Sequence, residues 1–234
     1  SSVITHPTDP KLYTMLGSAE DCASASPVLA EYLQTMVTIK TAILRCIAAG
    51  LGLEPSYFTR LHNENNNSLR IIRYLAGTIE TGNRCREHSD YGTITLLSTD
   101  GVSGLEAYHN GQWLPVPHVE GSLVVNVGSL MSRWTGGKLT ATLHRVAGPT
   151  SEGSHSSEGE LAEAVRRPRT SIAFFADPNK DVSTNLQGDK SKRSGEEEEK
   201  EMSVADYIRW RTGGSDAGRI SVAFTKEEEK RMEK

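Results

Sequence analysis

Two metal-capable side chains, His88 and Asp90, stand two residues apart in the segment EHSDYGTITLL (87–97). Alternate residues of a β-strand point the same way, so both side chains can face one point. A third candidate, His144, lies near the end of the alternating run LTATLHRVA (139–147). Two imidazoles and one carboxylate leave three adjacent positions open on ferrous iron. Zinc accepts the same ligands, so the ligand types alone do not choose the metal.

A second group of polar side chains can hold a small diacid beside such a metal. Arg169 and Ser171 share one face of the predicted strand around 170–176. A guanidinium binds a carboxylate through two parallel hydrogen bonds, and a hydroxyl adds one more donor. Tyr74, at the end of LRIIRYL (69–75), adds a phenolic donor. A diacid could therefore bind the metal at one end and this clamp at the other.

The segment 27–52 has the period of an amphipathic helix that supports these strands. Its apolar residues recur at spacings of three, four and seven: Leu29, Leu33, Met36, Ile43, Ile47 and Leu51. Ser26 is the expected N-cap, and Pro27 is expected at the first helical position. Gly50 or Gly52 is the expected stop.

Beyond residue 68 the sequence becomes a series of short strand-like runs bounded by Gly, Asn, Asp or Pro. The predicted strands are 69–75, 93–97, 104–108, 112–116, 122–128, 139–147 and 170–176. Closely spaced strands without crossover helices favour a mainly β fold with flanking helices, an antiparallel sandwich or jelly roll. Asn110 and Gly111 predict a tight hairpin turn. The polar segments 150–168 and 185–201 are expected to lie in solvent, and 203–211 is expected to form a helix.

Composition favours one globular domain over residues 1–234, with 36% hydrophobic residues. The formal net charge of −4 gives no electrostatic footprint for nucleic acid. No run of about 18 apolar residues and no signal peptide is visible, so no membrane partner is expected. Cys22, Cys46 and Cys85 are odd in number and form no CxxC pair, which indicates a reducing compartment and predicts a cytoplasmic location.

Five separated segments agree in order and spacing with one known family. They are LRIIRY, EHSDYGTITLL, GLEAYHNGQWLPVPHVEGSLVVNVGSLMSRWTGG, LHRVAGP and RTSIAFFADP. Together they resemble the iron(II)- and 2-oxoglutarate-dependent dioxygenases of the isopenicillin N synthase-like group. The resemblance covers residues 69–178, roughly half of the chain.

The resemblance implies a double-stranded β-helix, a jelly roll, that uses Fe(II), 2-oxoglutarate and O2 to oxidise a small molecule. It implies that iron is held by His88, Asp90 and His144. It also implies that Arg169, Ser171 and Tyr74 hold the distal carboxylate of 2-oxoglutarate. Succinate and carbon dioxide would be released.

The same resemblance suggests a layout of helical support (1–60), a jelly-roll core with the metal site (61–180), and a polar loop with C-terminal helices (181–234). Members of the group usually carry further N-terminal strands that are not found here. Leu75 replaces the usual Pro after the sheet Tyr, and Ser129 replaces a common acidic residue.

Two alternatives stay open from the sequence: an Fe(II) oxidase of the same group that does not use 2-oxoglutarate, and a non-catalytic binding scaffold. The sequence favours reading 150–168 as an insertion over reading it as a lid. Arg84 and Arg86 are expected on a solvated face, and Arg145 is expected to pair with an acidic neighbour on the face opposite His144. The remaining histidines are expected at the surface: His6, His62, His109, His118 and His155. Neither the substrate nor the oligomeric state is predicted.

Overall fold

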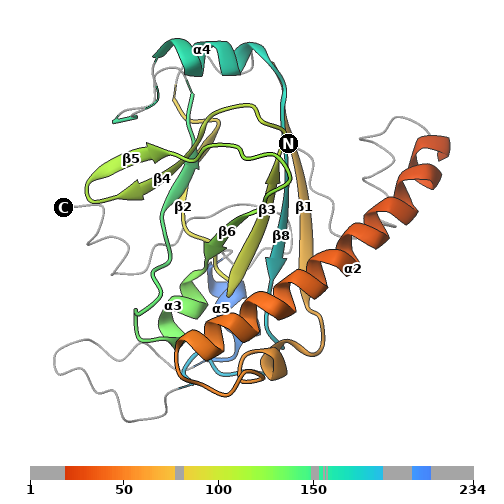
Figure 1. Cartoon of the computed structure of the whole chain (residues 1–234), viewed down its shortest axis with the longest axis vertical. Helices are drawn as coiled ribbons and strands as arrows, with labels where there is room; N and C mark the ends of the chain where they lie inside the picture. The colour runs from red at the N-terminus through yellow and green to blue at the C-terminus, as the bar shows by residue number, and fades with distance from the viewer. Residues whose placement is uncertain are drawn as a thin grey trace.

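The computed structural model describes residues 19–76, 82–148, 153–154, 156, 158–186 and 202–211. Its core is two four-stranded antiparallel sheets (Figure 1). The first sheet has the order β1-β8-β3-β6, with β1 Asn67–Tyr74, β8 Arg169–Ala176, β3 Ile94–Thr99 and β6 Val124–Val127. The second has the order β2-β7-β4-β5, with β2 Cys85–His88, β7 His144–Val146, β4 Leu105–His109 and β5 Gln112–Pro115. The predicted jelly roll with flanking helices is confirmed.

The strand predictions hold, with differences in extent. β2 was not predicted as a strand, and β7 is confined to the last part of the predicted run 139–147. β4 and β5 form the predicted hairpin, in which Asn110 has φ 48° and Gly111 has φ 81°. These positive φ values are the ones that Asn and Gly adopt most easily.

The long helix α2 (Ala19–Gly50) lies across the first sheet (Figure 1). It contacts β3 and β8, and its buried Leu44 and Ala48 join Leu96 and Phe174 in one apolar core. The predicted end at Gly50 is confirmed. The predicted start is wrong, because the helix begins at Ala19 and Pro27 lies inside it. The preceding segment AEDCASAS is rich in Ala, the best helix former, so the helix extends upstream of the proline.

Lys40 is a charged side chain buried on the inner face of α2. Its Nζ donates to Oδ1 of Asn65 at 3.2 Å and to Oδ1 of Asn67 at 3.4 Å. Burial lowers the pKa of Lys40. Asn67 is the first residue of β1, so these two bonds satisfy the buried ammonium and connect α2 to the start of the strand.

Shorter helices lie at the two ends of the sheets. A 3-10 helix (Thr59–His62) precedes β1, and α3 (Ser129–Trp134) and α5 (Val204–Arg211) lie together at one end (Figure 1). The helix predicted over 203–211 is therefore confirmed. α4 (Glu158–Arg166) lies at the opposite end, where β8 begins. In the part of the chain that the structure describes, no helix is both long and apolar enough to cross a membrane.

The expectation that 150–168 lies in solvent is wrong for its second half, which forms α4. Leu161 and Ala164, one helical turn apart, are both buried, so the helix packs on the protein despite its polar composition. Most of the polar run 185–201 lies outside the described residues.

Candidate metal centre

The fold brings together the three predicted metal ligands from separate segments. His88 ends β2, His144 begins β7, and the two residues are register partners across the second sheet. Asp90 follows in the connection to β3. One ligand atom from each of the three residues lies within 4.8 Å of the others, a set that could hold a metal ion. Nε2 of His144 is 3.8 Å from Oδ1 of Asp90.

Backbone hydrogen bonds orient both imidazoles. Nδ1 of His88 is 2.8 Å from the carbonyl oxygen of Arg86, and Nδ1 of His144 is 3.2 Å from that of Thr142. A carbonyl oxygen can only accept, so each Nδ1 carries the proton and each Nε2 keeps its lone pair. This is the tautomer that a metal-binding histidine needs, held by a backbone partner behind the ligand atom.

The Asp90 side chain is buried. Its Oδ2 is buried and meets no hydrogen-bond donor among the described residues. Burying an unpaired carboxylate oxygen is unfavourable, and a divalent cation between the carboxylate and two imidazoles would satisfy it. The three residues therefore fit a metal with nitrogen and oxygen ligands, such as ferrous iron.

The loop that carries Asp90 is held by the start of α3. The amide N–H of Ser129 donates to the carbonyl of Asp90 at 2.8 Å, and that of Leu130 donates to Tyr91 at 3.1 Å. The amide N–H of Gly128 donates to Thr93 at 2.9 Å. A Cβ on Gly128 would lie 2.1 Å from the carbonyl oxygen of Gly92, so only glycine allows the two segments to approach this closely.

A half-buried acid near Asp90, Asp177, was not singled out from the sequence. Burial, and next the negative charge of Asp90, raises the pKa of Asp177 to about 7. Asp177 directly follows β8, and its Oδ1 would lie 2.4 Å from a Cβ on Gly92. In the sequence, Asp177 is marked only by its place in the segment ADP (176–178) at the end of the predicted strand. Its contact with the Asp90 loop depends on the register between β3 and β8, which the sequence does not give.

The residues predicted to form the clamp lie on neighbouring strands of the first sheet. Tyr74, the last residue of β1, is the register partner of Arg169, the first residue of β8. The Arg169 guanidinium carbon lies 5.6 Å from the centroid of the Tyr74 ring, and its Nε donates to the carbonyl of Val102 at 3.2 Å. Arg169 is 1% exposed and Ser171 is 4% exposed, two residues along the same face.

Burial sets the ionisation of the clamp. It lowers the pKa of Arg169, an effect that Tyr74 and Asp100 oppose. Burial also raises the pKa of Tyr74, so its hydroxyl stays protonated at neutral pH. The pair therefore offers one cation and one neutral donor, the combination that suits a carboxylate.

Arg84 lies beside the clamp, and the expectation that it lies on a solvated face is wrong. Its side chain is buried, and its guanidinium carbon lies 5.5 Å from the Tyr74 ring centroid. The two arginines thus share one tyrosine ring. Burial, and next the charge of Arg169, lowers the pKa of Arg84. Its contacts come from segments far apart in the sequence, so no local pattern marks it.

The prediction that the other histidines lie at the surface is confirmed for two of them and wrong for His62. His109 and His118 are exposed as predicted, whereas His6 and His155 lie outside the described residues. His62 is buried, with Nδ1 2.7 Å from the carbonyl of Phe58 and Nε2 2.8 Å from Oγ1 of Thr93. Thr93 lies in the same loop as Asp90, so the hydrogen bond from His62 connects this loop to the 3-10 helix.

Comparisons with known proteins agree with this geometry. Residues 66–178 match a family model described as the 2OG-Fe(II) oxygenase superfamily. The 2-oxoglutarate-Fe(II) type oxidoreductase ppzD of Metarhizium rileyi (strain RCEF 4871) is 33% identical over 169 residues, 69% of this chain and 45% of that protein. The proline hydroxylase buaE of Petromyces alliaceus is 32% identical over 186 residues, 76% of this chain and 56% of that protein.

A solved structure of similar fold is that of a full-length Neurospora crassa protein in complex with alpha-KG, with a TM-score of 0.70 and 27% identity. The likeness covers 90% of this chain and 64% of that one. The chain spans about half the length of the curated relatives it matches. The matched segment contains both the metal-ligand set and the clamp, and the chain therefore belongs to the 2OG-Fe(II) oxygenase superfamily.

Proposed function

We propose that this chain is an iron(II)- and 2-oxoglutarate-dependent dioxygenase that hydroxylates or otherwise oxidises a small organic molecule, with release of succinate and carbon dioxide. The observation that carries the proposal is the approach of one ligand atom each from His88, Asp90 and His144 to within 4.8 Å of one another, with each Nδ1 bonded to a backbone carbonyl and each Nε2 left for a metal. Ferrous iron bound there would supply the redox chemistry that couples reduction of dioxygen to decarboxylation of 2-oxoglutarate and oxidation of a C–H bond.

The protein's own part is to bind and orient. Backbone carbonyls hold the imidazole protons at Nδ1, which keeps the ligand set in one geometry without using a titratable partner. In the proposal, Arg169 and Ser171 bind the distal carboxylate of 2-oxoglutarate, and the neutral hydroxyl of Tyr74 adds a donor. Enclosure of the clamp strengthens these interactions because little water competes for the charges.

Related proteins support a small-molecule substrate. One relative is named a proline hydroxylase, and another solved structure of the Neurospora crassa protein, 25% identical to this chain, is described in complex with alpha-KG and thymine. The net charge of −4 is also a poor match for a nucleic-acid partner. We also propose the single-domain layout inferred from the sequence, with residues 61–180 as the catalytic core, and a cytoplasmic location, since Cys46 and Cys85 are free thiols.

An anaerobic titration tests the proposal. Ferrous iron and then 2-oxoglutarate are added to the purified protein while the visible charge-transfer absorption of the chelate is followed. We expect a band in the parent, its loss in His144→Ala, and a much higher 2-oxoglutarate requirement in Arg169→Ala. A folded parent that binds iron but gives no band would exclude use of 2-oxoglutarate, and a parent that binds no iron would support a binding scaffold.

A further inference from the structure

The segment between β7 and β8 is anchored at both of its ends by buried charged side chains outside the metal-ligand set and the clamp. Here the bracing segment means the described residues 153–154, 156 and 158–167, which include α4. Its sequence is rich in Ser, Gly and Glu, a composition typical of solvated loops. Buried anchors on such a segment need an explanation.

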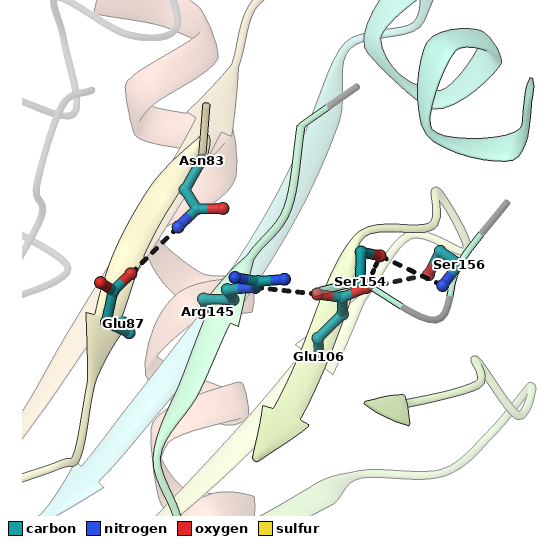
Figure 2. A network of polar contacts seen from close by, with 6 residues as sticks. All are labelled: Asn83, Glu87, Glu106, Arg145, Ser154 and Ser156. Atoms are coloured by element: carbon teal, nitrogen blue, oxygen red, sulfur yellow. Dashed lines mark hydrogen bonds and ion pairs between the residues drawn. The ribbon is translucent and has the colours of Figure 1, made fainter. Parts of the chain in front are cut away.

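The first anchor is Glu106 on β4, which is 0% exposed. Its Oε2 accepts from Nε of Arg145 at 2.8 Å, and its Oε1 accepts from the hydroxyls of Ser154 and Ser156 (Figure 2). The bond from Ser156 measures 3.1 Å. The Arg145 guanidinium also stacks 4.2 Å from the centroid of the Trp113 ring.

This anchor links the bracing segment to the metal-ligand set. Arg145 directly follows His144 on β7, and Glu106 is its register partner on β4. The predicted pairing of Arg145 with an acid is confirmed. The ion pair occupies one carboxylate oxygen of Glu106, and the second oxygen is left to the two serines. A buried carboxylate is stable only when both its charge and its lone pairs are satisfied, so the serines complete the site.

The second anchor is Arg84, which meets the bracing segment at its other end. Its Nη1 donates to the carbonyl of Ala164 at 3.3 Å, and its Nη2 donates to that of Arg167 at 3.2 Å. Nη2 also donates to the carbonyl of Leu75, the residue after Tyr74, at 3.3 Å. One guanidinium therefore joins the end of α4 to the end of β1 and lies on the ring of Tyr74.

Between the two anchors, the bracing segment forms part of the lining of a cavity. Ser156 and Glu160 line a cavity of about 240 Å³ that Arg169 also lines. α4 lies over the end of the barrel at which β8 begins with Arg169 (Figure 1). Leu161 and Ala164 turn inward and are buried there. The segment thus covers the clamp end of the barrel rather than the metal end.

We infer that the bracing segment closes the barrel over the cosubstrate carboxylate, and that Glu106 and Arg84 are positioning residues that hold it closed. The inference rests on the proposed function, since that proposal assigns Arg169, Ser171 and Tyr74 to 2-oxoglutarate. Opening this end would admit water to a buried cation and weaken its hold on a carboxylate. The metal ligands would be little affected as long as the ion pair between Arg145 and Glu106 persists.

The test removes the hydrogen bonds from Ser154 and Ser156 to Glu106 and keeps the ion pair between Glu106 and Arg145. In the double variant Ser154→Ala/Ser156→Ala, we expect the amides of α4 to exchange with deuterium on the order of tenfold faster than in the parent. In the anaerobic iron-loaded protein, the 2-oxoglutarate dissociation constant should rise by roughly three- to tenfold. The iron dissociation constant should stay within about twofold of the parent value. General destabilisation would weaken the binding of both iron and 2-oxoglutarate, so a change in 2-oxoglutarate binding alone indicates a local effect.

Ser56→Ala is the matched control, because it removes a Ser–Glu hydrogen bond (Ser56 to Glu54) at an exposed site. It should change neither α4 exchange nor cosubstrate binding. Arg84→Lys tests the second anchor, since lysine keeps the charge but lacks the planar fork that spans three carbonyls. We expect the same rise in the 2-oxoglutarate dissociation constant, and a higher KM for it with little change in kcat.

The possible failures are distinguishable. Exchange of α4 at the parent rate in the double variant would overturn the serine anchor. Faster exchange with unchanged 2-oxoglutarate binding would overturn the link between closure and the cosubstrate. A parent that binds iron but not 2-oxoglutarate would overturn the proposed function, and this failure appears in the parent rather than in the variants alone.

Discussion

At the scale of single residues, the clamp depends on the shape of a side chain as well as on its charge. Arg169 is buried, its Nε is bonded to the carbonyl of Val102, and its guanidinium lies against the ring of Tyr74. These contacts fix the plane of the fork before any ligand arrives. A fork held in this way can bind a carboxylate through two parallel bonds without further loss of side-chain freedom.

Arg169→Lys should therefore be a severe change although it preserves the charge. A lysine ammonium cannot make the paired bonds or stack on Tyr74, so about 2 kcal/mol of binding should be lost. We expect the KM for 2-oxoglutarate to rise by on the order of 30-fold with a smaller change in kcat, measured by succinate formation. Arg86→Lys, at an exposed position, is the control and should behave as the parent. An unchanged KM would remove Arg169 from the clamp.

Residue-level chemistry was predictable where it depended on side-chain type and short spacing, although Asp90 lies in the loop after β2 and not on the strand that the alternation assumed. His88, Asp90 and His144 could be chosen from side-chain type and alternation, and the structure brings them within ligand distance of one another. His62 and Arg84 could not be predicted as buried. His62 contacts the hydroxyl of Thr93, and Arg84 donates to carbonyls about 80 residues away in the sequence. Sequence patterns carry no information on such contacts.

At the scale of elements, the start of α3 and the Asp90 loop form one unit. The backbone amides of Gly128, Ser129 and Leu130 connect them by donating four hydrogen bonds to the loop carbonyls. The close approach of Gly128 to the carbonyl of Gly92 is possible only because Gly128 has no side chain. The loop that carries Asp90 is thus held by the start of α3.

Gly128→Ala should separate these elements. The added Cβ would overlap the carbonyl of Gly92, so either α3 or the loop must move, at a loss of about 1–3 kcal/mol in the free energy of unfolding. We expect weaker iron binding by at least about tenfold, because the movement displaces Asp90. Isothermal titration with iron and urea unfolding measure the two effects.

Gly50→Ala is the matched control, since a Cβ there meets nothing within 4 Å. It should leave iron binding unchanged and should not lower stability. Normal iron binding by a folded Gly128→Ala protein would show that the loop does not depend on α3.

Elements were predictable where the apolar period was strong. The body of α2, most strands and α5 follow such periods. The start of α2 was not predictable, because Ser26 and Pro27 form a good N-cap signal that the upstream segment overrides. α4 was also missed. Its stability comes from Leu161, Ala164 and the two buried anchors rather than from its polar sequence.

At the scale of the whole molecule, His62 connects the loop that carries Asp90 to the 3-10 helix that follows α2. This side chain is 2% exposed, and it links the 3-10 helix to Thr93 in the Asp90 loop. Burial lowers the pKa of His62 to about 4, the bond to the carbonyl of Phe58 opposes this shift, and the charge of Lys40 adds to it. The folded protein therefore holds His62 neutral at pH values where an unfolded chain would protonate it.

The consequence is acid sensitivity of the whole fold. Above the unfolded pKa of about 6.5, both states are neutral at His62 and the residue adds no pH dependence. Below it the unfolded state gains a proton first, so stability falls as the pH drops and the loss levels off near the folded pKa of about 4.

His62→Gln removes this titration and keeps a polar side chain. The variant should be less stable than the parent near neutral pH, because Gln cannot reproduce both bonds. Between pH of about 7.5 and pH of about 5, the parent should lose about 2 kcal/mol more unfolding free energy than the variant does. Urea unfolding at the two pH values measures the difference, and other titrating groups cancel because both proteins contain them. Equal losses in the two proteins would mean that His62 is accessible to protons in the folded state, and that the Asp90 loop is not connected to the 3-10 helix through a buried neutral imidazole.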